Sequence, residues 1–322
     1  MKNKLIITLA LLCCIASITF GQNHKETSGG WVKYKGNPVL GGKFGTIFDI
    51  SVLKVDAGYL MYCSWRPKHS IAISQSKDGL HWSDPKIVLA PDTTAGWETD
   101  LNRPVVVKRK DGYHMWYTGQ TWSGGRDGKS QIGYATSADG RHWTRKSSKP
   151  VLSPQLPWEK TAVMCPHVIW DASAGLFKMW YSAGEQYEPD AIGYATSKDG
   201  LNWKKYSANP VFVNDSSHQW EQAKVTACQV IKEKGAYYMF YIGFKNIDYA
   251  QIGMARSKDG VTNWVRNPGN PIVSPGNGWD ASAVYKPFTI FDGKKWLLWY
   301  NGRHDGVEQI GVAIHQGRDL GF

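Results

Sequence analysis

Residues 192–212 read IGYATSKDGLNWKKYSANPVF, and this stretch decides the fold because the chain repeats it. Two further copies are IGYATSADGRHWTRKSSKPVL, residues 132–152, and IGMARSKDGVTNWVRNPGNPIV, residues 252–273. Each copy contains an apolar strand, an Asp-Gly turn and a tryptophan that opens the next strand. The tryptophans at this position are 51, 61, 60 and 61 residues apart: Trp31, Trp82, Trp143, Trp203 and Trp264. A fixed period of this length is typical of propellers and other repeat architectures.

Each period contains four candidate strands. An apolar strand such as CQVIK, from Cys228, is followed by an aromatic strand such as FKMWYSAG, from Phe177, and then by the two strands of the quoted stretch. Alternating apolar residues, aromatic enrichment and Asp-Gly turns indicate antiparallel pairing. The last repeat stops after its third strand, which begins at Ile310, whereas the chain has an unpaired fourth strand at Trp31. We therefore expect an all-β, five-bladed β-propeller whose ring is closed by the N-terminal strand.

The N-terminus has the features of a secretory signal. Lys2 and Lys4 precede an apolar run over residues 5–20, followed by small and polar residues. This pattern predicts a signal peptide over residues 1–21, an exported protein (periplasmic or secreted), and a single propeller domain over residues 22–322. Three cysteines follow the signal, an odd number without close spacing, which favours neither a disulfide scaffold nor a zinc motif.

Composition and charge narrow the class of partner. The chain carries 16 Trp and 16 Tyr, whose rings suit either sugar stacking or the core of a β-sheet protein. Its formal net charge is +11, or about +9 without Lys2 and Lys4. A basic exported protein could favour an anionic polysaccharide, although solubility alone also accounts for the charge.

Aligning the inner strands places five residues at one position of the ring: Asp49, Arg103, Cys165, Ala227 and Lys286. Asp49 is the one carboxylate among them, and the two cations of the ring would keep it ionised. An ionised carboxylate at the mouth of the funnel suits a general base or a nucleophile. The alternative is a structural ion pair between Asp49 and Arg103.

The segment Phe48-Asp49-Ile50-Ser51-Val52 resembles the blade-one Asp-Pro motif of the five-bladed propeller glycoside hydrolases, the superfamily of families 32, 43, 62, 117 and 130, with family 43 as the reference pattern. The resemblance implies that Asp49 is the base or the nucleophile. It also places Met164 where relatives carry the proton-donating Glu. Asn102-Arg103-Pro104 stands where relatives carry an Asp before Pro, so the resemblance supplies one catalytic residue of three.

A second carboxyl group is needed to protonate the leaving oxygen. The acidic loop over residues 184–190 makes Glu185 the first candidate, because it directly follows a strand end and should point inward. Asp100 and Glu221 are the next candidates. Glu221, however, belongs to a Trp-acid pair that recurs in four repeats, and a recurring acid favours a structural hydrogen-bond acceptor.

Substrate contacts are expected from basic and aromatic residues near the funnel: Arg66, Arg103, Trp122, His167, Lys286, Arg303 and His304. Trp122 lies outside the regular tryptophan positions of the repeat, so it fits either a stacking platform or ordinary packing. No sequence pattern predicts a metal site or a cofactor.

The sequence therefore predicts a monomeric, secreted glycoside hydrolase that acts on a plant or algal polysaccharide or its oligosaccharides. The family resemblance implies xylosidase- or arabinosidase-like substrates. A non-catalytic sugar-binding propeller, a glycoside phosphorylase and a protein-interaction platform remain alternatives. The expected partner is a carbohydrate, with neither nucleic acid nor a membrane span involved.

Overall fold

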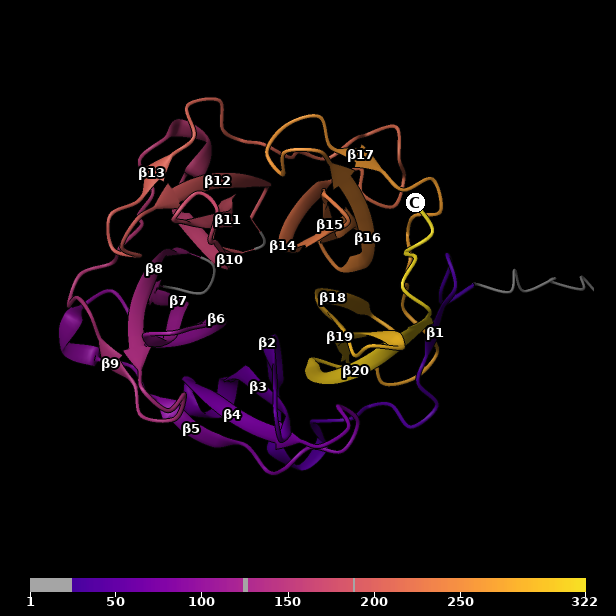
Figure 1. Ribbon diagram of the computed structural model, residues 1–322, viewed down its shortest axis with the longest axis horizontal. Helices are drawn as coiled ribbons and strands as arrows, with labels where there is room; N and C mark the ends of the chain where they lie inside the picture. Colours follow the sequence, from indigo (N-terminus) through magenta and orange to yellow (C-terminus); the bar gives the residue numbers. More distant parts are fainter. Residues whose placement is uncertain (1–24, 124–126, 188) are drawn as a thin grey trace, which may run out of the picture.

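A computed structural model describes residues 25–123, 127–187 and 189–322 of the chain (Figure 1). The predicted signal peptide, residues 1–21, lies outside these residues. The described residues form strands and four short 3-10 helices: η1 (Gly42–Phe44), η2 (Arg66–Lys68), η3 (Thr93–Ala95) and η4 (Pro157–Glu159). No helix in the described part of the chain is both long and apolar enough to cross a membrane.

The strands follow one another in sets of four. The first set consists of β2 (Ile47–Val55), β3 (Gly58–Trp65), β4 (Ser70–Ser76) and β5 (Lys86–Leu89). The second consists of β6 (Asp100–Arg109), β7 (Gly112–Ser123), β8 (Asp127–Ser137) and β9 (Thr144–Arg145). The third consists of β10 (Ala162–Asp171), β11 (Leu176–Gly184), β12 (Ala191–Ser197) and β13 (Lys204–Lys205).

The fourth set consists of β14 (Lys224–Glu233), β15 (Ala236–Asn246), β16 (Tyr249–Ser257) and β17 (Val265–Arg266). The fifth consists of β18 (Ala283–Phe291), β19 (Lys295–His304), β20 (Val307–Gln316) and the N-terminal strand β1 (Trp31–Lys33). Pairing within each set is antiparallel. The second and third sets are joined into one eight-stranded sheet by a single parallel pair, Ala162 with Ser130.

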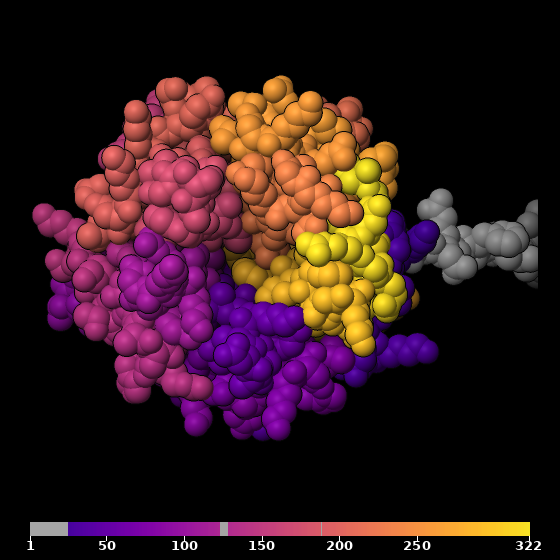
Figure 2. All heavy atoms as spheres, viewed as in Figure 1, coloured from indigo at the N-terminus to yellow at the C-terminus, as the bar shows by residue number. Residues whose placement is uncertain are grey.

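The N-terminal strand completes the fifth set. Trp31 pairs with His315 of β20, and Val32 and Lys33 continue the antiparallel register. The predicted pairing of the orphan N-terminal strand with the last repeat is therefore observed. Figure 1 shows the sets arranged in chain order around a centre. The space-filling view shows the corresponding coloured sectors in contact with one another around a central hollow (Figure 2).

Neighbouring sets are joined by hydrogen bonds from aromatic side chains to the Asp-Gly turns, and these bonds repeat from set to set. The indole N–H of Trp116 in β7 donates to the carbonyl of Gly200, in the turn of the third set, over 2.9 Å. Trp299 of β19 donates in the same way to Gly79 of the first set over 2.8 Å, so the last set contacts the first. Equivalent bonds join two further pairs of sets: Tyr62 with Gly140, and Trp180 with Gly260. These contacts assign the repeated aromatic and Asp-Gly residues to structure.

A buried acid, a tyrosine and a cation form a second repeated unit. Glu159 has no exposed surface; its Oε1 accepts a hydrogen bond from the Tyr181 hydroxyl at 2.8 Å and its Oε2 lies 2.6 Å from the Lys205 ammonium. The other units are Glu98 with Tyr117 and Arg145, Glu221 with Tyr241 and Arg266, and Asp280 with Tyr300 and Lys33. The first set has Cys63 where these sets have the tyrosine.

This arrangement corrects the expectation that Glu221 is a candidate catalytic acid. Its side chain is fully buried against Tyr241, Arg266 and His218, and it does not line the cavity described below. The recurrence of the unit in four sets supports the structural interpretation that the sequence also allowed.

We predict that Glu221→Gln lowers the free energy of unfolding by about 3 kcal/mol, because Arg266 loses its buried counter-charge. Urea unfolding followed by tryptophan fluorescence measures the change. The matched control is Asp84→Asn, since Asp84 pairs with Lys43 where both side chains are 70% exposed, and it should change stability by less than about 1 kcal/mol. A Glu221→Gln protein as stable as the wild type would contradict the structural role.

Candidate functional site

The inner strand of every set carries a β-bulge at the position that the sequence alignment singled out. The register shifts between Phe48 and Ser51 in β2, and the strands β6, β10, β14 and β18 shift at the equivalent place. The bulged residues all adopt positive φ angles of 30–55°: Asp49, Arg103, Cys165, Ala227 and Lys286. Bulges redirect side chains, and this conformation costs a non-glycine residue about 1–3 kcal/mol.

The bulges are held by bonds to the preceding set in the ring. The Asp49 N–H donates to Oδ1 of Asn301 in β19 over 3.0 Å, and the Arg103 N–H donates to the Ser64 hydroxyl over 2.8 Å. The corresponding donors in the third and fourth sets bond to hydroxyls at 3.1 and 2.7 Å: Cys165 to Thr118, and Ala227 to Ser182. Side chains on the second strands therefore compensate for the backbone groups that the bulges remove from pairing.

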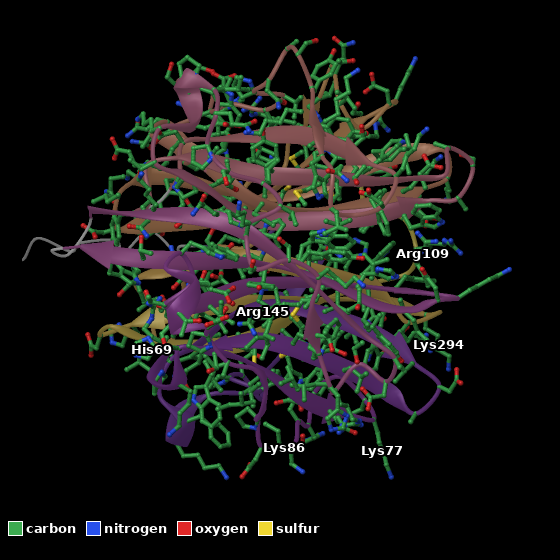
Figure 3. All side chains as sticks on the ribbon, turned by 90° about the vertical axis from the view of Figure 1, so that its left-hand side faces the viewer. His69, Lys77, Lys86, Arg109, Arg145 and Lys294 are labelled. Atoms are coloured by element: carbon green, nitrogen blue, oxygen red, sulfur yellow. The ribbon has the colours of Figure 1, made fainter. Side chains whose placement is uncertain are left out.

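A cavity of about 290 Å³ opens beside this ring of bulges. Its lining comes from several sets and combines carboxylate, guanidinium, amide and aromatic groups: Phe48, Asp49, Arg66, Arg103, Gln120, Trp122, Cys165, Gln186, Tyr187, Pro189, Thr226, Ala227, Ile242, Tyr285, Arg303, Gly306 and Glu308. Figure 3 places His69, in the β3–β4 connection, at the opposite face from Lys77, Arg109 and Lys294. The connections between second and third strands and the Asp-Gly turns thus lie on opposite faces.

Asp49 lies in the wall of this cavity with 4% of its surface exposed. Its Oδ1 accepts a hydrogen bond from the Asn301 amide at 3.1 Å, and its Oδ2 lies 3.2 Å from Nε of Arg103. The ion pair with Arg103 that the sequence offered as an alternative is therefore present. It coexists with a position in the cavity wall, so the carboxylate is both oriented and within reach of a ligand.

Arg103 is itself fixed in place. Its Nη1 donates to Oδ1 of Asn102 over 2.7 Å and to Oε1 of Gln120 over 3.4 Å, and Gln120 in turn donates to the Ser130 hydroxyl over 2.8 Å. The guanidinium is 17% exposed and lines the cavity, as expected. Asn102 and Gln120 are neutral amides, so these two hydrogen bonds orient the Arg103 guanidinium without neutralising its charge beside Asp49.

Glu308, at the start of β20, is the second carboxyl group in the cavity wall, and our sequence reasoning missed it. Its Oε1 accepts a hydrogen bond from the Tyr285 hydroxyl over 2.5 Å, and its backbone N–H donates to Thr46 over 3.3 Å. Burial raises the pKa of Glu308, and the charge of Asp49 raises it further, whereas Arg66 opposes the shift.

A signal for Glu308 was present in the sequence. Two residues before the isoleucine of each third strand, the five sets carry different side chains: His69, Ser130, Asp190, Ala250 and Glu308. The alignment described above compares the inner strands and leaves the third strands out. The same search on the third strands would have selected Glu308 and Asp190, and Asp190 lies 2.7 Å from Lys160.

Three of the other predicted substrate-binding residues line the cavity. The Arg66 guanidinium stacks 4.3 Å from the ring centre of Phe48, and Nη2 of Arg303 donates to the carbonyl of Asp248 over 2.8 Å. Trp122 is 43% exposed at the cavity, which favours the stacking platform over ordinary packing.

Asp100 lies behind Trp122 rather than in the wall. Its Oδ2 accepts a hydrogen bond from the Trp122 indole at 3.3 Å, and its Oδ1 lies 3.8 Å from Nδ1 of His69. Its carboxylate is 8% exposed, and it does not line the cavity. The position of Asp100 therefore supports a role in orienting Trp122, and the expectation that it is an acid in contact with substrate is corrected.

The side chains of Glu185 and His304 were predicted to face the funnel, and both point away from it. Glu185 points outward: its side chain is 64% exposed and lies 3.4 Å from the Lys160 ammonium. Its neighbour Gln186 turns inward instead and donates to the carbonyls of Thr121 and Lys129, a cross-strand pair near the turn end of the β7–β8 hairpin. His304 also lies outside the cavity, with a 46% exposed side chain near Asp305.

His167 and Lys286 are buried beneath the ring rather than exposed in it, with 5% and 3% of their surfaces accessible. Nε2 of His167 lies 2.9 Å from the carbonyl of Val230, the direction expected of an N–H donor. Burial lowers the pKa of His167 to about 3, so the ring is neutral at physiological pH. Neither residue lines the cavity, and their predicted contacts with substrate are corrected.

Within residues 25–123, 127–187 and 189–322, no cluster of three or more His, Cys, Asp or Glu side chains has the arrangement to hold a metal ion.

Comparison with known families identifies this kind of site. The model of the glycosyl hydrolases family 32 N-terminal domain matches residues 58–230, more than half of the chain. The chain belongs to this family. The predicted resemblance to propeller glycoside hydrolases is thereby confirmed, and family membership supports a carbohydrate-active, glycosidase-like enzyme.

Individual relatives are more distant. An uncharacterized protein of Mycobacterium tuberculosis is 29% identical over 218 residues, covering 65% of this chain and 69% of the relative. A beta-1,2-mannobiose phosphorylase of Thermoanaerobacter sp. is 34% identical over 138 residues, covering 38% of this chain and 44% of the relative. The solved structure of a thermostable family-43 glycoside hydrolase superposes with a TM-score of 0.69 at 22% identity, covering 89% of this chain and 94% of that one, and shows that the fold is shared.

The buried His167 generates a pH prediction. Between about pH 6.5 and 3 the unfolded chain binds a proton at this side chain that the folded chain does not bind, so stability falls as the pH falls through this window. We expect His167→Gln to weaken that loss, measured as the difference between urea midpoints at pH 7 and pH 4. The exposed His69 gives the control: His69→Gln should keep the wild-type difference. If His167→Gln showed the same difference between its urea midpoints as the wild type, the buried neutral His167 would not be the source of the loss of stability.

Proposed function

We propose that the chain is a five-bladed propeller enzyme that hydrolyses glycosidic bonds, with the scissile bond held beside Asp49. The observation that carries the proposal is the position of this carboxylate in the cavity wall, fixed by Asn301 on one oxygen and by Arg103 on the other. Membership of the glycosyl hydrolase family supports the same activity.

Asp49 can contribute in two ways. As a base it takes a proton from a water that attacks the anomeric carbon, and as a nucleophile it attacks that carbon itself. Both roles need an ionised carboxylate in a fixed orientation. The guanidinium of Arg103 lies against one carboxylate oxygen, and the amide of Asn301 sets the orientation through two reciprocal hydrogen bonds. The configuration of the released sugar distinguishes the two roles, because a base leads to inversion at the anomeric carbon and a nucleophile leads to retention.

The cavity is suited to the end of a sugar chain. Its volume of about 290 Å³ lies at the low end of the range of roughly 300–1,000 Å³ that is typical of small-molecule sites. Trp122 and Tyr187 offer ring faces on which a sugar can stack. The proposed reaction is therefore the removal of terminal units from an oligosaccharide or a polysaccharide of plant or algal origin.

The guanidinium groups favour a substrate that carries negative charge. Arg66 and Arg303 line the cavity, and neither forms an ion pair with a carboxylate in the described part of the chain. Carboxylate or sulfate groups on a sugar would supply the missing counter-charge through charge-assisted hydrogen bonds. Uronate-containing or sulfated saccharides therefore belong in the first screen, beside xylosides and arabinosides.

A glycoside phosphorylase is the second candidate. The same guanidinium groups could bind inorganic phosphate, and one relative is a mannobiose phosphorylase. We favour hydrolysis because the N-terminal sequence is typical of exported proteins, and phosphorolysis depends on the phosphate pool of the cytoplasm.

The proposal includes export to the periplasm or the medium. It is supported by the sequence alone, through Lys2, Lys4 and the apolar run over residues 5–20. These residues lie outside the described part of the chain.

We predict that Asp49→Asn reduces turnover by about 10²- to 10⁴-fold and leaves sugar binding intact, because the amide keeps the shape but cannot accept a proton or attack carbon. Initial rates on a panel of 4-nitrophenyl glycosides and natural oligosaccharides, with calorimetric titration of the best substrate, measure both effects. Asp84→Asn, at an exposed side chain outside the cavity, is the control and should be fully active. Full activity in Asp49→Asn would remove Asp49 from the mechanism.

A second prediction separates the two candidate reactions. Hydrolysis should proceed at the same rate with and without inorganic phosphate, and the product should be the free sugar rather than a sugar phosphate. Chromatography of the products at zero and 10 mM phosphate, about the concentration at which a phosphorylase would be saturated, provides the measurement. Dependence on phosphate would establish the phosphorylase, and binding of oligosaccharides without any product would leave a sugar-binding protein.

A further inference from the structure

We propose that Glu308, carried by the fifth set of strands, is the general acid that protonates the departing oxygen of the glycosidic bond. This inference rests on the proposed hydrolase function and names the residue that completes it. It moves the acid from the third set, where the family resemblance led us to expect it, to the set that neighbours Asp49.

The first argument is the composition of the cavity wall. Among the described residues that line the cavity, Asp49 and Glu308 are the two with carboxyl groups. They come from neighbouring elements, since Asp49 bonds to Asn301 of β19 and Glu308 is the second residue of the adjacent strand β20. Asn301, which bonds to Asp49, pairs across β19 and β20 with Ile310, two residues after Glu308, so the register brings both carboxyl groups to the same part of the cavity wall.

The second argument is an unused hydrogen-bonding atom. Oε1 of Glu308 accepts a hydrogen bond from Tyr285, whereas Oε2 is buried and makes no hydrogen bond with any described residue. A buried polar oxygen without a hydrogen-bond partner is costly, and Oδ2 of Asp49 in the same cavity wall also lacks one. An oxygen of a bound substrate would supply the missing partner, and a proton on Oε2 would then point at that oxygen.

The third argument is the protonation state that an acid requires. The groups that act on Glu308 are Asp49 on β2, Arg66 on η2, Arg103 on β6 and Tyr285 on β18. Arg303 on β19 is its cross-strand partner and lines the same cavity. Burial and the negative charge of Asp49 favour the protonated form, while the two guanidinium groups and the Tyr285 hydrogen bond favour the ionised form. The balance raises the pKa of Glu308, in the direction that a general acid near neutral pH needs.

The third set has lost the capacity for this role. Met164 stands where the family resemblance expects the proton donor, and it is fully buried in an apolar cluster with Ala162, Ile242 and Phe244. A carboxyl group at this position would have to enter that cluster.

The reaction balances with these two carboxyl groups. The bond between the anomeric carbon and the departing oxygen breaks with its electron pair on that oxygen, which takes the proton from Glu308 and leaves as an alcohol. The anomeric carbon gains a bond either to the oxygen of a water that gives its proton to Asp49, or to Asp49 itself. In the second case the ionised Glu308 then takes a proton from the water that releases the sugar.

The test uses the dependence of the rate on the leaving group. Glu308→Gln is compared with the wild type on methyl and 2,4-dinitrophenyl glycosides of the sugar that gives turnover in the 4-nitrophenyl panel. Dinitrophenolate leaves without protonation, whereas methoxide requires it. We expect Glu308→Gln to lose about 10²- to 10⁴-fold on the methyl glycoside and to stay within about tenfold of wild type on the dinitrophenyl glycoside.

The pH profile gives a second readout. In the wild type, kcat/KM on the methyl glycoside should fall on the alkaline side as Glu308 ionises. Glu308→Gln has no such group, so its kcat/KM on the dinitrophenyl glycoside should show no alkaline fall. Glu185→Gln, a carboxyl change at an exposed side chain outside the cavity, is the matched control and should behave as wild type on both substrates. Thermal unfolding of each variant verifies that the fold is retained.

The outcomes are distinct. Equal losses on both glycosides in a folded Glu308→Gln protein would make Glu308 a positioning residue for Asp49 and overturn its role as the acid. Wild-type rates on the methyl glycoside would also overturn it, while an effect of Asp49→Asn would still support the hydrolase. A wild-type protein without turnover on any glycoside would overturn the proposed function itself.

Discussion

The β-bulge in each inner strand is the constraint on which the site depends. At this position the chain leaves regular pairing, adopts a positive φ angle and turns a side chain to the ring around the cavity. The displaced N–H groups bond to side chains of the preceding set, as Asp49 bonds to Asn301 and Arg103 to Ser64. Packing between neighbouring sets therefore stabilises a backbone conformation that a single sheet would not hold, and the same contacts orient the candidate catalytic carboxylate.

The structure separates two classes of buried acid by their partners. Glu159 and its three counterparts each face a tyrosine and a cation across neighbouring strands, which neutralises their charge within the framework. Asp49 and Glu308 share a cavity whose guanidinium groups are also open to a ligand. Each acid of the first class has a cation within its own unit, whereas Oε2 of Glu308 makes no hydrogen bond with a described residue. Charge compensation in the framework is complete before substrate binds, and in the cavity it is left for the substrate to complete.

The sequence predicted more of the fold than of the site. The period of the tryptophans and the alignment of the inner strands correctly located Asp49 and Arg103 at the bulges, because both follow from local repetition. The same alignment placed Lys286 in this column, although its side chain is buried and does not line the cavity. Strand position is periodic, but the direction in which a side chain points depends on the neighbouring set, so residues of one column can be exposed to the cavity or buried beneath it.

The sequence by itself determined the antiparallel strands in sets of four, the turn residues and the pairing of the N-terminal strand with the last repeat, since hydrophobic periodicity and turn chemistry are local. Only the tertiary structure decided which acid joins Asp49. Glu185 and Glu308 both stand near the connection between a second and a third strand, yet one extends to Lys160 and the other packs under Tyr285. The difference arises from contacts between residues distant in the chain, which no local pattern encodes.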